Sequence, residues 1–235
     1  MKTTKQKRLF LSITCLCLAL FISGCGDEKT SKSEEKETPQ KKYEPEANFV
    51  VENNEKECTI TGYKGNSQDL NIPSKIGGHT VTQIGQDAFK ECKAIVNVEI
   101  PDTVKKIGEG AFYSCSSLKS VIVPKGVTEI GSSAFNGCES LESVIITNTV
   151  KTIRIDTFSF CSSLKSVTIP EGVTDIGESA FSYCSNLESV TIPKSVTEIG
   201  RRAFHGCSSL KEVKVPSECR YESESFDKDC KVIKY

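Results

Sequence analysis

The stretch IPKSVTEIGRRAFHGCSSLKEV, residues 192–213, decides the fold because it copies an earlier stretch of the chain. Twenty-three residues before it the chain reads IPEGVTDIGESAFSYCSNLESV, residues 169–190. The two stretches agree at their apolar positions, at the glycine and at the cysteine. A fixed period of this size is typical of solenoids, in which each repeat forms one coil and stacks on its neighbours.

The period begins at Ile72, and its apolar positions predict the cross-section of a coil. In the copy that starts at Ile169 the predicted inward residues are Ile169, Val173, Ile176, Ala180, Phe181, Cys184, Leu187 and Val190. This is enough for the interior of one coil but too little for a coil to fold alone, so stacking must supply the remaining burial. The same period defines columns of cysteine (Cys92, Cys115, Cys138, Cys161, Cys184, Cys207, Cys230), phenylalanine (Phe89, Phe112, Phe135, Phe158, Phe181, Phe204) and leucine (Leu118, Leu141, Leu164, Leu187, Leu210).

Alternation of side chains predicts a short strand in each coil. Val190 and Ile192 are expected to face inward, with Ser189 and Thr191 outward. A second extended piece is expected at 173–177, and the segment 178–184 is expected to form a helical or 3₁₀ turn on the opposite side. The predicted fold class is therefore a β-rich solenoid with 23-residue coils, short strands on one face and short helical or 3₁₀ turns opposite.

Two further features of the repeat lead to specific expectations. One column is glycine in nearly every copy, which predicts a backbone with positive φ there; its members are Gly85, Gly108, Gly131, Gly177 and Gly200. The copy at 146–168 departs from the pattern, with Thr147 for proline, Arg154 for glycine and Thr157 for alanine. That coil is expected to bulge or bend.

The repeat x-I-P-x-x-V-T-x-I-G-x-x-A-F-x-x-C-x-x-L-x-x-V resembles the BspA-like leucine-rich repeat of bacterial surface proteins. The resemblance covers roughly residues 72–235, and 72–214 is assigned to the leucine-rich repeats. It departs from the general leucine-rich repeat because the cysteine precedes the strand by three residues. The resemblance implies a solenoid that binds protein without catalysis, and adhesion to host extracellular-matrix proteins or to other microbes.

Both ends of the solenoid are expected to be capped, because a bare terminal coil would expose apolar surface and strand edges. Residues 49–71 are assigned to a β-hairpin cap turning at 53–56, with Cys58 and Ile60 against the first coil. An insertion at 75–80 predicts a protruding turn. Residues 215–235 are assigned to a degenerate C-terminal cap repeat, in which Cys219 takes the valine column and Glu222 the isoleucine column.

The first 24 residues are predicted to be a lipoprotein signal peptide. A basic start is followed by the apolar run 9–22, which is too short to span a bilayer and ends in small residues. The ending Ile22-Ser23-Gly24-Cys25 resembles the bacterial lipobox, which implies that Cys25 is lipidated; the alternative is an ordinary signal peptide with a chance cysteine. Residues 25–48 are predicted to be the lipid anchor and a disordered tether, because they are highly charged and almost without apolar side chains.

The cysteine column is predicted to form a buried ladder of free thiols, since a thiol is a small apolar group with a weak S–H donor. Side chains that point the same way have poor disulfide geometry. A bridge at one end remains open for an exported protein, with Cys219–Cys230 as the first choice. There is neither a C-x-x-C motif nor a Cys–His cluster, so a zinc site is disfavoured and no cofactor other than the lipid on Cys25 is expected.

Composition and motifs argue against catalysis and against nucleic-acid binding. The formal net charge is −1, which gives no electrostatic basis for binding nucleic acid. The only two histidines are His79, in the inserted turn, and His205, in a variable column. No recurring nucleophile–base grouping and no phosphate-binding loop accompany them, so an enzyme is not expected.

The outward strand columns offer candidate contact residues. One column alternates in charge and is expected to place opposite charges side by side, for solubility and register: Lys119, Glu142, Lys165, Glu188 and Lys211. Two others are small or β-branched and form a candidate strip for a protein partner: Ser120, Ile122, Ser143, Ile145, Ser166, Thr168, Ser189 and Thr191. The alternative explanation for this strip is ordinary strand propensity.

These observations predict an extracytoplasmic, lipid-anchored protein, expected at the cell surface, that acts as a non-catalytic binding or adhesion module. The predicted partners are a host matrix protein or another microbial surface protein, with the membrane reached through the anchor. The competing interpretation is an envelope scaffold that holds partner subunits or cell-wall polymer without host contact. The adhesion step rests on analogy between folds.

Overall fold

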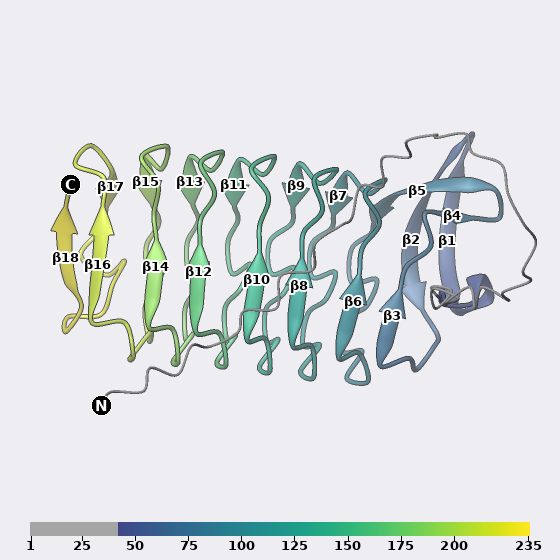
Figure 1. The fold of residues 1–235 in the computed structure, drawn as a ribbon, viewed down its shortest axis with the longest axis horizontal. Coiled ribbons are helices and arrows are strands. Elements are labelled where there is room, and N and C mark those ends of the chain that lie inside the picture. Colours follow the sequence, from purple (N-terminus) through teal and green to yellow (C-terminus); the bar gives the residue numbers. More distant parts are fainter. Residues whose placement is uncertain (1–41) are drawn as a thin grey trace, which may run out of the picture. The chain divides into compact units, whose positions relative to one another are not determined.

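A computed structural model describes residues 42–235, which form a β-solenoid with two rows of short parallel strands (Figure 1). The front row consists of β3 (Asp69–Asn71), β6 (Asn97–Glu99), β8 (Ser120–Ile122), β10 (Ser143–Ile145), β12 (Ser166–Thr168), β14 (Ser189–Thr191), β16 (Glu212–Val215) and β18 (Lys231–Lys234). The second row consists of β5 (His79–Ile84), β7 (Lys106–Ile107), β9 (Glu129–Ile130), β11 (Thr152–Ile153), β13 (Asp175–Ile176), β15 (Glu198–Ile199) and β17 (Arg220–Tyr221). The predicted β-rich solenoid of 23-residue coils is confirmed, and the segments expected to be helical or 3₁₀, such as 178–184, are consecutive tight turns.

The third side of each coil is the A-F-x-x-C segment, which we call the turn face. It contains consecutive tight turns: Ser182 N–H donates to Ser179 O at 3.0 Å and Cys184 N–H to Phe181 O at 3.3 Å. It also bonds to the next coil, since Phe181 N–H donates to Ala203 O at 2.8 Å. The one helix among residues 42–235 is the 3₁₀ turn η1 (Glu46–Asn48), and no helix in that range is long and apolar enough to cross a membrane.

The interior contains the residues that the repeat pattern placed there. Of the eight inward positions in the coil at 169–191, seven are buried and Val190 is half-buried against the core. The phenylalanine column forms a continuous stack from Phe89 to Phe226, with neighbouring ring centroids 5.0–5.4 Å apart. Identical side chains therefore pack on one another along the whole solenoid, and each coil uses its neighbour as its core.

The N-terminal end is closed by a hairpin of β1 (Phe49–Asn54) and β2 (Glu57–Tyr63), which pair antiparallel. β2 then pairs in parallel with β5, and Cys58 and Ile60 are buried against the first coil. The insertion forms a second small hairpin in which β4 (Lys75–Ile76) pairs with β5. Its turn is Gly77-Gly78, and both glycines have positive φ.

The prediction that disorder extends to residue 48 is wrong for residues 42–48. Asn48 Nδ2 and the Tyr63 hydroxyl both donate to Glu44 Oε1 at 2.7 Å, and Glu44 N–H donates to Asn71 O at 3.1 Å. Polar contacts to the cap hold this segment in place. The prediction of disorder considered only its low apolar content and so overlooked these contacts. The signal peptide, Cys25 and the rest of the tether lie outside the described residues.

The glycine column does not have positive φ, so that prediction is wrong. A Cβ on Gly200 would lie 2.6 Å from the backbone N of Glu178 in the preceding coil, and one on Gly108 would lie 2.6 Å from the carbonyl carbon of Gly85. The column is glycine because the coils approach too closely there for any side chain. Positive φ, between 53° and 73°, occurs instead in two turn-face columns: Asp87, Gly110, Ser133, Asp156, Ser179, Arg202 and Glu91, Ser114, Gly137, Phe160, Tyr183, Gly206.

The degenerate coil at 146–168 interrupts both rows of strands. β10 and β12 do not pair, nor do β9 and β11, so each row consists of two separate sheets. Both interruptions lie between this coil and the one before it. Arg154 stands there in the glycine column, where a side chain cannot fit at the spacing of the other coils. The expected irregularity is therefore a loss of strand pairing between neighbouring coils, and Arg154 in the glycine column offers a steric explanation for it.

The C-terminal cap is shifted by one residue from its prediction. β17 pairs Tyr221, not Glu222, with Ile199. The Tyr221 ring packs edge-on against Phe226 at 5.7 Å, which accounts for an aromatic residue in this column. Cys219 is buried and Cys230 half-buried, and both are free thiols, so the Cys219–Cys230 disulfide is not present.

Candidate functional site

The outward side chains of the front row form the candidate contact strip, and all eight predicted members are exposed. Ile122 and Ile145 are 59% and 56% exposed, and they lie opposite each other because β8 pairs with β10 in register. Two large aliphatic side chains therefore stand side by side in solvent, on a strand pair whose inward side is packed into the core.

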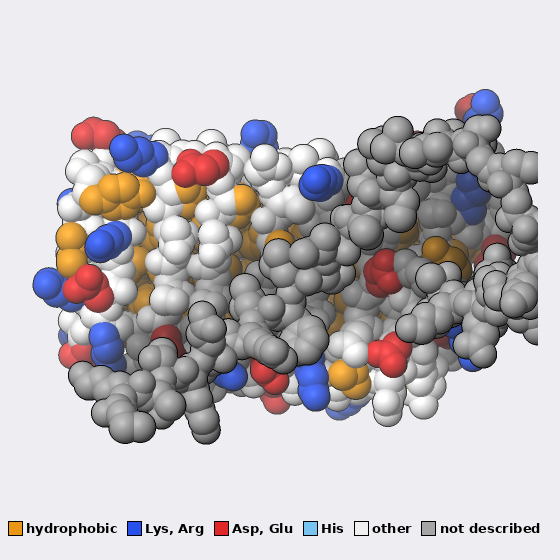
Figure 2. Space-filling view, viewed as in Figure 1, with side chains coloured by type: hydrophobic (Ala, Val, Ile, Leu, Met, Phe, Trp, Pro, Cys, Tyr) orange, Lys and Arg blue, Asp and Glu red, His pale blue; other side chains and the backbone are white. Residues whose placement is uncertain are grey.

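The interruption divides the strip into two halves. Ser120, Ile122, Ser143 and Ile145 belong to the β8–β10 pair, and Ser166, Thr168, Ser189 and Thr191 to the β12–β14 pair. The first half is aliphatic and the second carries only hydroxyl-bearing side chains. Figure 2 shows uncharged side chains over β12 and β14, with charged side chains above them.

Each half of the strip borders a shallow hollow. The hollow beside the aliphatic half has a volume of about 500 Å³ and is lined by Ile122, Val123 and Pro124, with Asp102 and Lys125 at its rim. The hollow beside the hydroxyl half has a volume of about 320 Å³ and is lined by Thr191, Lys214 and Tyr235. The aliphatic half therefore offers the larger recess for a partner side chain.

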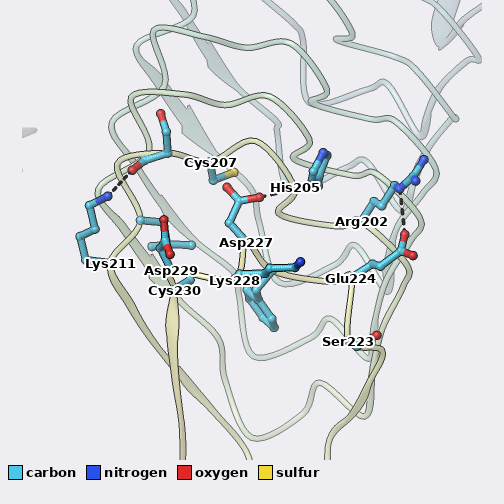
Figure 3. A pocket seen from close by; sticks show the side chains of 13 residues that line it. Arg202, His205, Cys207, Lys211, Ser223, Glu224, Asp227, Lys228, Asp229 and Cys230 are labelled. Atoms are coloured by element: carbon cyan, nitrogen blue, oxygen red, sulfur yellow. Dashed lines mark hydrogen bonds and ion pairs between the residues drawn. The ribbon is translucent and has the colours of Figure 1, made fainter.

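A third hollow, of about 590 Å³, lies at the C-terminal cap (Figure 3). His205 Nδ1 lies 3.2 Å from Asp227 Oδ1, and Arg202 Nε lies 3.0 Å from Glu224 Oε2. Burial raises the pKa of the Cys207 thiol, so it is a protonated group and a poor nucleophile. No group of three or more metal-ligating side chains occurs among residues 42–235. Four of the charged groups that line the hollow therefore form two ion pairs, His205–Asp227 and Arg202–Glu224.

The cysteine column forms the predicted buried ladder, and the structure shows what each thiol does. Every buried thiol from Cys115 to Cys207 donates to the carbonyl of the phenylalanine in the preceding coil, at 3.1–3.3 Å. Burial raises the pKa of Cys138 and of Cys184 to about 12. Cysteine thus recurs because it fills a small apolar site and satisfies a buried carbonyl at the same time.

The alternating charge column contains one ion pair at contact distance. Lys165 Nζ lies 3.8 Å from Glu142 Oε2, and both side chains are more than half exposed. A pair this exposed contributes little to stability.

Reasoning from the sequence missed one exposed aromatic pair on the turn face. Phe160 and Tyr183 are 49% and 47% exposed, and their rings stack with centroids 4.8 Å apart. A signal was present, because the residue before the cysteine is glutamate, serine, glycine or aspartate in the other copies, but phenylalanine and tyrosine in these two. A repeat analysis that follows only the shared columns overlooks such departures.

Comparison with known proteins places this architecture in a family. The sequence pattern of the family described as the BspA type leucine-rich repeat region matches residues 63–185 and 128–235, in six copies. The chain belongs to this family. No curated protein shows significant similarity to it.

Several solved structures share the fold of this BspA-type repeat protein. A leucine-rich repeat protein of T. pallidum is 33% identical, with a TM-score of 0.69, over 74% of this chain and 85% of that one. A leucine-rich cell surface protein of Faecalibacterium prausnitzii is 34% identical, with a TM-score of 0.72, over 83% of this chain and 55% of that one. A leucine-rich repeat protein of Bacteroides ovatus is 33% identical over 76% of this chain and 49% of that one, with a TM-score of 0.68.

The chain thus spans about half the length of two of these three relatives. Repeats of this family are protein-interaction modules of bacterial surface proteins, and the solenoid is typically a non-catalytic scaffold. The family membership supports a protein partner in general terms. The kind of partner has to be inferred from the chemistry of the exposed surfaces.

Proposed function

We propose that this chain is a cell-surface lipoprotein whose solenoid is a non-catalytic adhesion module. In this proposal Cys25 carries the lipid, and the partner is a host matrix protein or another microbial surface protein. The aliphatic half of the strip makes the central contact. The relative from F. prausnitzii, described as a cell surface protein, supports the location, and the family supports a protein partner.

The observation that carries this proposal is the exposed Ile122–Ile145 pair. The core does not require isoleucine at these two outward positions, because the inward residues of β8 and β10 already fill it. Burying one such side chain under a partner contributes about 1.5–3 kcal/mol. Aliphatic side chains next to a recess, with charged groups at the rim, match the core-and-rim arrangement of protein interfaces.

Binding to a panel of immobilised ligands tests this site. Residues 42–235 would be passed over fibronectin, fibrinogen, mucin and cell-wall polymer. We expect one protein ligand to bind, and Ile122→Lys with Ile145→Lys to abolish that binding. Ser166→Lys with Thr168→Lys is the matched control, because it adds the same charge to the hydroxyl half. Equal loss in both variants would place the contact elsewhere or make it nonspecific.

The anchor is tested separately in the native bacterium. Cys25→Ala should release the protein from the membrane fraction, whereas Cys17→Ala, in the apolar run of the signal, should not. Membrane retention of the Cys25→Ala protein would overturn the lipoprotein assignment.

Protease treatment of intact cells distinguishes an adhesin from an envelope scaffold. A surface adhesin is removed by the protease, whereas a scaffold that faces inward is protected. Protection, together with binding to cell-wall polymer alone, would replace the adhesin by the scaffold.

A further inference from the structure

The stacked pair Phe160–Tyr183 lies on the turn face, away from the strip of the proposed function. Both residues have positive φ, 59° and 58°, a conformation that bulky side chains rarely adopt. The same column is Gly137 in the coil before and Gly206 in the coil after. The neighbours in this column have no side chain, the Tyr183 ring packs over Gly206, and about half of each aromatic residue remains exposed. Nothing in the core requires aromatic residues at these two positions.

The two turns that carry the pair and the turn before them are acidic and contain no base, whereas His205 of the following coil packs its ring edge-on against Tyr183, with centroids 5.6 Å apart. Residues 132–140, 155–163 and 178–186 contain Glu139, Asp156 and Glu178 but no lysine, arginine or histidine. None of these three carboxylates has an ion pair or a side-chain hydrogen bond within residues 42–235. Burial, and then the nearby Glu178, raise the pKa of the Asp156 carboxyl.

Each of these carboxylates belongs to the surroundings of the pair. Asp156 lies in the same turn as Phe160, and Glu178 in the same turn as Tyr183. Glu139 is adjacent in the preceding coil, since Ser162 Oγ and Ser163 N–H both donate to its backbone carbonyl, at 3.3 and 3.1 Å.

The bases that flank this region already have partners, including His205, whose Nδ1 lies 3.2 Å from Asp227 Oδ1. Arg154 pairs with Glu129 at 3.1 Å. Arg201 and Arg202 both contact Glu224, at 3.1 and 3.0 Å. The three carboxylates therefore remain available, whereas most charges around them are neutralised within the chain.

We propose that Phe160, Tyr183, Glu139, Asp156 and Glu178 form a docking surface for an extended arginine- or lysine-rich segment of another protein. A cation binds over the face of an aromatic ring, where the quadrupole is negative, and a planar guanidinium also stacks on that face. The carboxylates supply the complementary charge and steer the partner. A neutral glycan would use the rings but would gain little from three unpaired carboxylates, so the charge favours a basic peptide.

The test measures fluorescence anisotropy of a labelled peptide of alternating arginine and serine, added to the full-length chain in detergent micelles. Phe160→Ser with Tyr183→Ser should weaken binding about tenfold or more. Serine already occupies this column at Ser114 with positive φ, so the fold should tolerate it. Glu139→Gln with Asp156→Asn and Glu178→Gln should weaken binding similarly, and the loss should grow as salt is lowered toward the regime of weak screening.

Matched controls separate this surface from general attraction. Ile122→Ser with Ile145→Ser also removes two exposed apolar side chains, but from the front strip, and should leave peptide binding unchanged. Glu171→Gln with Glu188→Gln and Glu218→Gln removes the same charge elsewhere and should also have little effect. Phe160→Tyr with Tyr183→Phe should retain binding, and thermal melts verify that every variant is folded.

Three results would overturn the proposal. The first is peptide binding that ignores the loss of both rings in a folded variant. The second is equal weakening by the two charge variants, which would indicate attraction to net charge alone. The third is binding of a neutral N-acetylglucosamine oligomer that requires the rings but not the carboxylates, which would identify the surface as a glycan site.

Discussion

Coil 146–168 and coil 169–191 have the same interior but different relations to the coil before them. Both contribute a phenylalanine to the stack and a buried thiol that donates to a carbonyl of the preceding coil. The later coil also pairs through both of its strands, whereas the earlier coil pairs with its predecessor through neither. The turn face stays joined in both, since Phe135 N–H donates to Thr157 O and Phe158 N–H to Ala180 O.

At this junction the interior columns and the turn-face hydrogen bonds persist although the strands are not paired. We attribute the lost pairing to Arg154, because in the other coils this column is glycine and a Cβ there would meet the backbone of the preceding coil. Threonine hydroxyls partly compensate in the irregular coil: Thr147 Oγ1 donates to Pro124 O at 3.2 Å and Thr149 Oγ1 to Val127 O at 2.6 Å.

The largest expected effect concerns the interior that both coils share. Thiols of the unfolded chain ionise near pH 9, whereas burial raises the pKa of Cys138 and Cys184 to about 12. Stability from the protonated thiols is therefore complete below about pH 9 and is lost as the pH rises to about 12. Denaturant unfolding at a series of alkaline pH values should show this decline. A Cys138→Ser/Cys184→Ser protein should decline less steeply, and an identical slope would contradict the assignment.

The second effect comes from placing an arginine in the glycine column of a regular coil. Gly200→Arg should lower the free energy of unfolding by about 2–3 kcal/mol, because its Cβ meets the backbone of Glu178. Arg201→Ser, at a neighbouring exposed position, is the control and should have little effect. An unchanged unfolding midpoint for Gly200→Arg would mean that this column tolerates a side chain without loss of stability. Steric contact would then not explain the missing strand pairing at Arg154.

Substituting the thiols tests whether the turn side is truly equivalent in the two coils. Cys161→Ser and Cys184→Ser should each destabilise the protein by about 1–2 kcal/mol, because a more polar group enters the same buried site. Cys92→Ser, at a half-buried position, should have a smaller effect. If Cys161→Ser were much milder than Cys184→Ser in urea unfolding, the interior would also be loosened in the irregular coil.

The sequence was sufficient to predict the features that recur in every repeat. It was insufficient to predict features that depend on which side chains become neighbours in space. Period, inward columns and strand alternation follow from residue type alone, so the positions of Phe181, Cys184 and Ile122 were correctly predicted. The role of Gly200 was misassigned because positive φ and close backbone approach select the same residue. The stacking of Phe160 on Tyr183 and the order of residues 42–48 depend on individual side-chain contacts that no period encodes.

Reversing the irregularity should give a smaller effect with the opposite sign. Arg154→Gly allows its N–H to reach Ile130 O, as Gly177 N–H reaches Ile153 O at 2.7 Å. We expect a gain of about 0.5–1 kcal/mol, reduced by loss of the half-exposed pair with Glu129. Hydrogen exchange at residues 151–154 should slow. Arg154→Ala retains the Cβ and is the control, so equal slowing there would point to the guanidinium and not to the backbone approach.

The smallest effect compares the charge column at the interrupted junction with the same column at an intact one. Glu142 pairs with Lys165 across the interruption, whereas Glu188 lies on β14's coil, where the strands are joined. Glu142→Lys should destabilise the protein by about 0.2–1 kcal/mol at low salt, because it replaces an attraction by a repulsion. Glu188→Lys should have a lesser effect, since Glu188 has no ion pair within residues 42–235. Both effects should fade in high salt. A loss of stability that persists in high salt would mean that Glu142 acts through packing between β10 and β12. The ion pair with Lys165 would then not be the interaction that matters at this junction.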